Sequence, residues 1–157
     1  MKEINKTLEE VFGYTSFRPG QEEVINHLMQ KKKLLAVMPT GAGKSLCYQL
    51  PALLFENQTI VVSPLVALMD DQVIGLKDLG VKAERVHSGM PESKRTQIWE
   101  DFKSKQIKIL YISPESLMRN EMLNALKPLN ISMFVVDEAH CISKHFTHAH
   151  ALILLVP

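Results

Sequence analysis

The chain has 157 residues, a length that suits one domain, and 46% of them are apolar while 22% are charged. This composition excludes disordered, collagen-like and disulfide-dense proteins. The net charge of +1 provides no global basic field, so a nucleic-acid partner would need a local patch. Cys47 and Cys141 have no metal-like or redox spacing, which is typical of a reducing compartment. No apolar run reaches signal-peptide or membrane-span length, so we expect a cytoplasmic protein with no membrane partner.

Hydrophobic periodicity predicts an α/β fold. Ile4, Leu8 and Val11 predict a short helix, and QEEVINHLM after Pro19 predicts a second. Short apolar strands then alternate with helices of 10–15 residues, which is typical of βαβ units and a mostly parallel sheet. The expected strands cover residues 34–38, 59–63, 81–87, 107–112 and 131–136. The expected helices cover 65–79, 91–104 and 114–126, together with a helix after residue 45 that Pro51 shortens or kinks.

The segment GAGKS (41–45) lies between an expected strand and an expected helix, which is the context of a phosphate-binding loop. Its glycines let backbone N–H groups point at phosphate oxygens, at a helix N-terminus whose dipole also favours anions. Lys44 would reach the β- and γ-phosphates, and the Ser45 hydroxyl would ligate Mg²⁺. The strict pattern has glycine where this chain has Met38. The alternative is a glycine-rich turn with an exposed lysine, which the flanking strand and helix disfavour.

An acidic pair follows a second apolar strand in FVVDEAH (134–140). The Asp137 carboxylate should emerge at the carboxyl edge of the sheet, where open α/β sheets bind ligands. Asp137 would hold Mg²⁺, directly or through water, and Glu138 would polarise the attacking water. The alternative is a pair of acidic residues that cap the next helix. The phosphate loop and the acidic pair together indicate an ATPase-type core.

Beyond these two motifs, the chain resembles the N-terminal part of RecQ-type DNA helicases, superfamily-2 enzymes with two RecA-like domains. The resemblance covers about residues 8–143 and includes the family's nucleotide-recognition motif, motifs I, Ia and II, and a DNA-side motif. The matching segments are FGYTSFRPGQ (12–21), MPTGAGKSLCYQLPAL (38–53), SPLVALMDDQV (63–73), YISPE (111–115) and DEAHCIS (137–143).

The resemblance assigns further roles, with ATP and Mg²⁺ as cofactors and single-stranded or duplex DNA as partner. Gln21 would read the adenine edge, Arg18 and Tyr14 would flank the base or phosphates, and His140 would couple the nucleotide to the DNA side. The implied nucleotide-binding residues are Tyr14, Arg18, Gln21, Thr40, Gly41, Ala42, Gly43, Lys44 and Ser45. The implied catalytic residues are Lys44, Asp137, Glu138 and His140, with Mg²⁺ on Ser45 and Asp137. The implied DNA-binding residues are Ser63, Pro64, Leu65, Ser113, Pro114 and Glu115.

The resemblance implies 3′-to-5′ unwinding coupled to ATP hydrolysis, DNA repair and recombination, and a nucleoid association if the source is bacterial. One rival is a non-catalytic fragment that binds Mg-ATP without helicase activity. A second rival is an RNA-directed helicase, which the sequences around the phosphate loop and Cys141 disfavour. A titration that compares stimulation by DNA and RNA would separate the two helicases.

The family pattern ends after Ser143. We expect an incomplete first RecA-like domain over residues 1–143 and an atypical tail over 144–157, which resembles a truncation or frameshift product. An arginine finger, worth about 10³–10⁵ in turnover, is absent from the motifs, so the isolated chain is expected to be catalytically incomplete. The terminal ALILLV run either joins the edge of the core or is an aggregation hazard. Cys141, His145, His148 and His150 match no common zinc spacing, so incidental exposed histidines are favoured over a metal site.

Overall fold

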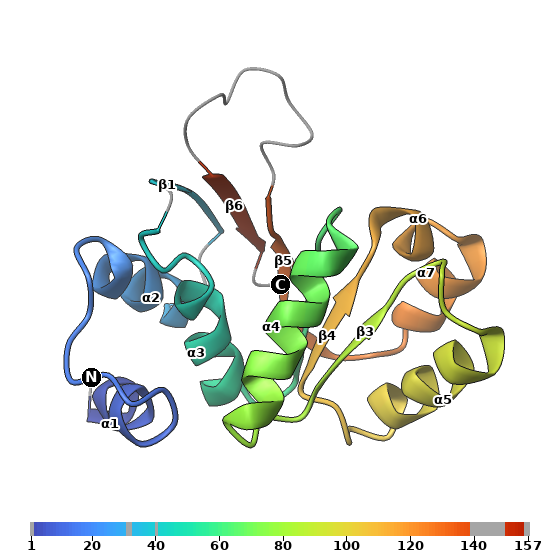
Figure 1. Cartoon of the computed structure of the whole chain (residues 1–157), viewed down its shortest axis with the longest axis horizontal. Helices are drawn as coiled ribbons and strands as arrows, with labels where there is room; N and C mark the ends of the chain where they lie inside the picture. The colour runs from blue at the N-terminus through green and yellow to red at the C-terminus, as the bar shows by residue number, and fades with distance from the viewer. Residues whose placement is uncertain (1, 31–32, 40, 139–149, 156–157) are drawn as a thin grey trace.

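The computed structural model describes residues 2–30, 33–39, 41–138 and 150–155. In this part of the chain the expected helices and strands occur in the expected order, but the helix expected over 114–126 is two helices and residues 150–155 add a strand (Figure 1). The helices are α1 (Lys2–Glu10), α2 (Gln21–Met29), α3 (Leu46–Leu54), α4 (Val66–Asp78), α5 (Glu92–Lys103), α6 (Pro114–Leu117) and α7 (Asn120–Leu126). The strands are β1 (Leu34–Met38), β2 (Gln58–Val62), β3 (Ala83–Val86), β4 (Ile109–Ile112), β5 (Ile131–Val136) and β6 (His150–Leu155).

The strands form one sheet in the order β1-β6-β5-β2-β4-β3. The strands β5, β2, β4 and β3 pair in parallel, whereas β6 is antiparallel to both of its neighbours. Because β1 and β5 are both antiparallel to β6, they run in the same direction. Five strands therefore end at one edge of the sheet. The expected α/β class with a mostly parallel sheet is confirmed.

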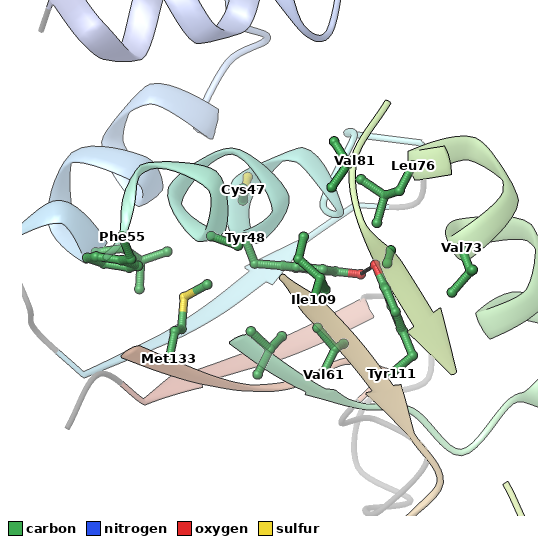
Figure 2. Close-up of a cluster of buried hydrophobic side chains, with 14 of the residues drawn as sticks. Cys47, Tyr48, Phe55, Val61, Val73, Leu76, Val81, Ile109, Tyr111 and Met133 are labelled. Atoms are coloured by element: carbon green, nitrogen blue, oxygen red, sulfur yellow. Dashed lines mark hydrogen bonds between the residues drawn. The ribbon is translucent and has the colours of Figure 1, made fainter. Parts of the chain in front are cut away.

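Alternate strand residues divide the core between the two faces of the sheet, as the two-residue period of a strand requires. Val61, Ile109 and Met133 pack on the face that α2, α3 and α4 cover (Figure 2). Ile60 and Leu110 pack on the opposite face with side chains of α5, α6 and α7. Helices cover both faces, which is why β2 and β4 are buried along their whole length.

A third apolar cluster attaches the N-terminal helices to α3. It contains Ile4 and Leu8 from α1, Ile25 from α2, and Leu46 and Leu50 from α3. All five side chains are buried, and burying a leucine or isoleucine stabilises a fold by about 1.5–3 kcal/mol. Because α3 directly follows the loop 41–45, the packing of α1 and α2 on α3 keeps the segment before α2 close to that loop.

The expectation of one continuous helix over 114–126 is wrong. The Ser113 hydroxyl accepts a hydrogen bond from the backbone N–H of Ser116 and caps α6, which ends at Leu117. Arg119 then has extended backbone angles, φ −65° and ψ 131°, before α7 begins at Asn120. An apolar periodicity that continues across the break concealed it, because both short helices pack on the same face of the sheet.

Residues 150–155 form β6, which lies inside the sheet between β1 and β5 and not at its edge. The register pairs Leu35 with Ile153 on one side and Val135 with Leu154 on the other. The rest of the expected tail, residues 144–149 and 156–157, lies outside the described residues. The same holds for Cys141, His145 and His148 of the weighed zinc site. Within the described ranges, no group of three His, Cys, Asp or Glu side chains could hold a metal ion.

Candidate functional site

The loop between β1 and α3 has two glycines with left-handed backbone angles. Gly41 has φ 79° and Gly43 has φ 75°, a region that residues with a Cβ enter only with strain. At Gly43 an added Cβ would lie 2.4 Å from the Nε2 atom of Gln21, whereas at Gly41 it would meet nothing within 4 Å. Thr40 lies outside the described residues. The loop thus has the glycine-dependent turn that a phosphate-binding loop needs.

Lys44 brings this loop and the acidic pair together. Its Nζ lies 2.8 Å from Oδ1 of Asp137 and 2.8 Å from Oε1 of Glu138. The side chains of the three residues are 10%, 3% and 8% exposed, so this ion-pair cluster is nearly closed to water. Both carboxylates follow the end of β5, where the sequence placed them. Residues 94 positions apart in the chain therefore form one charged site.

The acidic pair itself is held in an unusual backbone conformation. Glu138 has φ 57°, the left-handed region, and its backbone N–H donates to Oδ1 of Asp137 at 2.8 Å. The backbone N–H of Asp137 donates to the carbonyl of Val62 at 2.9 Å and continues the sheet ladder. A non-glycine residue in this region costs about 1–3 kcal/mol and persists only where the surroundings enforce it.

The residues around Lys44 fit a magnesium–polyphosphate group. A cavity of about 230 Å³ is lined by the loop from Pro39 to Ser45, as far as it is described, and by Glu138. It offers the Lys44 ammonium group, the Ser45 hydroxyl and the Glu138 carboxylate, and the Asp137 carboxylate lies 2.8 Å from the same ammonium group. Ammonium groups and loop N–H groups bind phosphate oxygens, and Mg²⁺ prefers carboxylate and hydroxyl oxygens. The donor set is therefore the one that Mg-ATP requires.

Gln21 and Arg18 hold the loop through its backbone carbonyls. The Gln21 amide donates to the carbonyls of Ala42 at 3.1 Å and Gly43 at 2.9 Å, and its Oε1 accepts from the Arg18 backbone at 2.8 Å. The Arg18 guanidinium donates to the Gly41 carbonyl at 2.6 Å. Both ends of the Gln21 amide are thus used within the protein, and its predicted contact with adenine stays a prediction.

A second cavity of about 380 Å³ adjoins the loop. Gly43 and Ser45 line both cavities, so the two lie next to each other at the start of α3. Phe12, Tyr14 and Gln21 line the second cavity from the N-terminal side, and Tyr14 is 51% exposed. An aromatic ring beside an open cavity suits a planar heterocycle. The predicted base-binding residues and the predicted phosphate-binding residues therefore line two adjoining cavities.

The predicted DNA-binding residues lie at the ends of β2 and β4, on the same edge of the sheet as Asp137. The backbone N–H of Ser63 donates to Ile112 at 3.1 Å, and that of Ser113 donates to Val86 at 3.1 Å. The Ser113 hydroxyl caps α6, and both serines are buried. Pro64, Leu65 and Glu115 are exposed, and Pro114 is half-buried. Of the predicted DNA-binding residues, those that are exposed are thus mostly apolar in this structure.

Several residues at the site were not predicted from the sequence. Tyr48 and Gln49 on α3 and Tyr111 on β4 form buried hydrogen bonds next to Asp137. These residues could not be recognised as part of the site from the sequence, because a tyrosine in a buried helix or strand most often only packs in the core. Cys47 is buried, and burial raises the pKa of its thiol to about 12. His140, the predicted coupling residue, lies outside the described residues.

Comparison with known proteins supports the sequence resemblance. Residues 18–155 match the family model of DEAD/DEAH box helicases. The chain is 46% identical over 137 residues to the ATP-dependent DNA helicase RecQ of Haemophilus influenzae, covering 87% of this chain and 22% of that protein. The chain therefore spans about a fifth of the length of this relative.

Two solved structures share the fold. A hypothetical ATP-dependent RNA helicase from Sulfolobus tokodaii superposes with a TM-score of 0.72 and 22% identity over 91% of this chain and 43% of its own. The DUF1998 helicase MrfA, bound to DNA and AMPPNP, superposes with a TM-score of 0.61 and 23% identity over 74% of this chain and 17% of its own. No helix in the described part of the chain is long and apolar enough to cross a membrane. The chain belongs to the DEAD/DEAH box helicase family, and the resemblance to RecQ-type helicases within it is confirmed.

Proposed function

We propose that this chain binds Mg-ATP between the loop 39–45 and the acidic pair, as the first RecA-like domain of a DNA helicase that unwinds 3′ to 5′. The observation that carries the proposal is the contact of Lys44 Nζ with both Asp137 and Glu138 at 2.8 Å. It supports a site in which the phosphate-binding and metal-binding groups act together. The relative in Haemophilus influenzae, an ATP-dependent DNA helicase, supports DNA as the nucleic acid.

In this proposal the residues divide the work by their chemistry. The Lys44 ammonium exchanges its two carboxylate partners for the β- and γ-phosphates, while loop N–H groups bind the remaining phosphate oxygens. Ser45 and Asp137 hold Mg²⁺, which neutralises phosphate charge and orients the γ-phosphate when bound. After Lys44 has moved, the Glu138 carboxylate accepts a hydrogen bond from the attacking water. His140 couples this site to the DNA side.

Titration of the purified chain with a fluorescent ATP analogue in Mg²⁺ tests the nucleotide site. Lys44→Ala is expected to lose binding at least about 100-fold, because the phosphates lose a charge-assisted contact in a buried site. Ser45→Ala, which leaves the ion-pair cluster intact, should weaken binding in Mg²⁺ but not in EDTA. Circular dichroism confirms that each variant is folded. Unchanged affinity in both variants would contradict the phosphate-loop assignment.

Phosphate release with single-stranded DNA, with RNA and without nucleic acid tests the finer assignment. Stimulation by DNA above that by RNA is expected of a protein that contains the complete helicase. Binding without turnover in the 157-residue chain would support the second candidate, a Mg-ATP-binding unit that needs the rest of the enzyme. Stimulation by RNA alone would contradict the assignment to DNA.

Gln21→Ala is expected to reduce the preference for ATP over GTP. The reason is that the Gln21 amide lines the cavity of about 380 Å³ next to the loop, in which we expect the base to bind. It should also lower the affinity for both nucleotides several-fold, since the carbonyls of Ala42 and Gly43 lose their hydrogen-bond donor. Competition titrations with ATP and GTP measure both effects. Equal weakening of the two nucleotides would limit Gln21 to holding the loop and remove it from base recognition.

A further inference from the structure

A chain of buried hydrogen bonds connects Asp137 to α3, β4 and α4. The Tyr48 hydroxyl lies 2.9 Å from Oδ2 of Asp137 and 3.2 Å from the Tyr111 hydroxyl (Figure 2 shows the tyrosine pair). The Gln49 amide donates to the Tyr111 hydroxyl at 3.1 Å and to Gln72 Oε1 on α4 at 2.7 Å. Tyr48 and Tyr111 are 0% and 1% exposed. None of these contacts involves the loop or the ion pairs of Lys44.

The direction of the hydrogen bonds follows from the charge on Asp137. A carboxylate only accepts, so Tyr48 must donate its single proton to Oδ2. Tyr111 must then donate to Tyr48, and the Gln49 amide supplies the bond that Tyr111 accepts. Burial also raises the pKa of Tyr48 and of Tyr111, which keeps both hydroxyls protonated. The hydrogen bonds from Gln49 through Tyr111 and Tyr48 therefore all run toward Asp137.

Packing alone does not account for the two hydroxyls. They lie in an apolar cluster with Val61, Ile109 and Met133, where phenylalanine rings would fill nearly the same space. A buried hydroxyl without a partner costs about 1–3 kcal/mol, so these groups are tolerated only because each is hydrogen-bonded. Tyr111 contacts Tyr48, and Tyr48 in turn contacts a single carboxylate oxygen, Oδ2 of Asp137. The other oxygen, Oδ1, faces Lys44 and the loop.

We propose that Tyr48 is a positioning residue for Asp137: its hydroxyl fixes Oδ2 so that Oδ1 stays directed at the phosphate loop, and Tyr111 and Gln49 hold that hydroxyl in place. The inference rests on the proposed function for its consequence, the placement of Mg²⁺. Partners of a metal-binding carboxylate commonly set metal affinity by 10–100-fold. Lys44 lies two residues before α3 and Tyr48 lies in the first turn of α3, so the start of this helix places a contact on each oxygen of Asp137.

Tyr48→Phe tests the inference through the Mg²⁺ dependence of nucleotide binding. The Mg²⁺ concentration for half-maximal binding of the fluorescent ATP analogue is expected to rise about 10-fold or more, while affinity in EDTA stays within about twofold. Tyr111→Phe is the matched control, because it removes an equally buried hydroxyl but leaves the bond from Tyr48 to Asp137. It should shift the Mg²⁺ requirement by less. A lower melting temperature with an unchanged Mg²⁺ requirement in Tyr48→Phe would overturn the inference.

Two further measurements separate this inference from the proposed function. Crystal structures of the wild type and Tyr48→Phe should show a rotated Asp137 carboxylate in the variant, whether or not nucleotide binds, and an unrotated one would overturn the inference. The double variant Tyr48→Phe/Tyr111→Phe leaves no tyrosine hydroxyl unpaired and should fold if Tyr48→Phe does not. It should retain the Mg²⁺ defect. Failure of the wild type to bind any nucleotide would contradict the proposed function, while the crystal structures would still decide the role of Tyr48.

Discussion

Replacing Lys44 with alanine should lower the free energy of unfolding by about 3–5 kcal/mol in the absence of nucleotide, the cost of breaking a buried ion pair by removing one partner. Lys44 is the cation between Asp137 and Glu138, and all three side chains are at most 10% exposed. Without it, two carboxylates remain side by side in a site that is nearly closed to water. Urea denaturation of the wild type and the variant measures the difference.

The chain offers a matched control for this experiment. Lys77 on α4 forms an ion pair with Glu84 on β3, but its side chain is 48% exposed. Lys77→Ala should therefore cost less than about 1 kcal/mol, as exposed pairs do. Adding Asp137→Asn to Lys44→Ala should recover part of the lost stability, because one unpaired charge is removed. Equal losses for the two lysine variants would contradict the buried cluster.

Gly43→Ala is expected to destabilise the protein by about 2–5 kcal/mol. About 1–2 kcal/mol comes from forcing an alanine into a left-handed conformation. The rest arises because the new Cβ would lie 2.4 Å from Nε2 of Gln21, whose amide is buried. The amide can move away, but it then loses its bonds to Ala42 and Gly43, each worth about 0.5–1.5 kcal/mol. The same movement should reduce nucleotide affinity.

Gly41→Ala carries the same backbone strain as Gly43→Ala but lacks the contact with Gln21, so comparing the two variants separates the two effects. Gly41 has nearly the same φ, 79°, but an added Cβ meets nothing within 4 Å, so this variant should show only the backbone cost. In a double-mutant cycle, Gln21→Ala should remove most of the difference, because the clashing amide is absent. If the two glycine variants were equally stable, Gln21 would not be holding the loop through this contact.

Local patterns made much of the site predictable. The apolar run LLAVM followed by GAGKS is a strand and a turn whose chemistry depends only on neighbouring residues. The same is true of Asp137 and Glu138 after the strand 131–136. Parallel strands of an α/β sheet end at one edge, so the meeting of Lys44 with the acidic pair followed from fold class alone. The family resemblance added Gln21 and Arg18, which the structure places against the loop.

The remaining features depend on contacts between distant segments. The hydroxyl chain from Gln49 to Asp137 needs α3, β4 and β5 to be placed, and no spacing in the sequence encodes that arrangement. The break between α6 and α7 lies at Arg119, whose extended backbone interrupts an apolar periodicity that continues across it. The position of β6 inside the sheet depends on its pairing with β1, near the other end of the chain.

That pairing has a consequence for the order of folding. In the described part of the chain, β6 is the sole strand hydrogen-bonded to β1, and it also bridges β1 to β5. During synthesis, β1 emerges long before residues 150–155, and contacts of such large sequence separation form slowly because a long loop must close first. The parallel strands β2 to β5 pair with one another, and all of them are synthesised before residues 150–155. The phosphate loop, although encoded near the N-terminus, is therefore expected to take its final place opposite the acidic pair last.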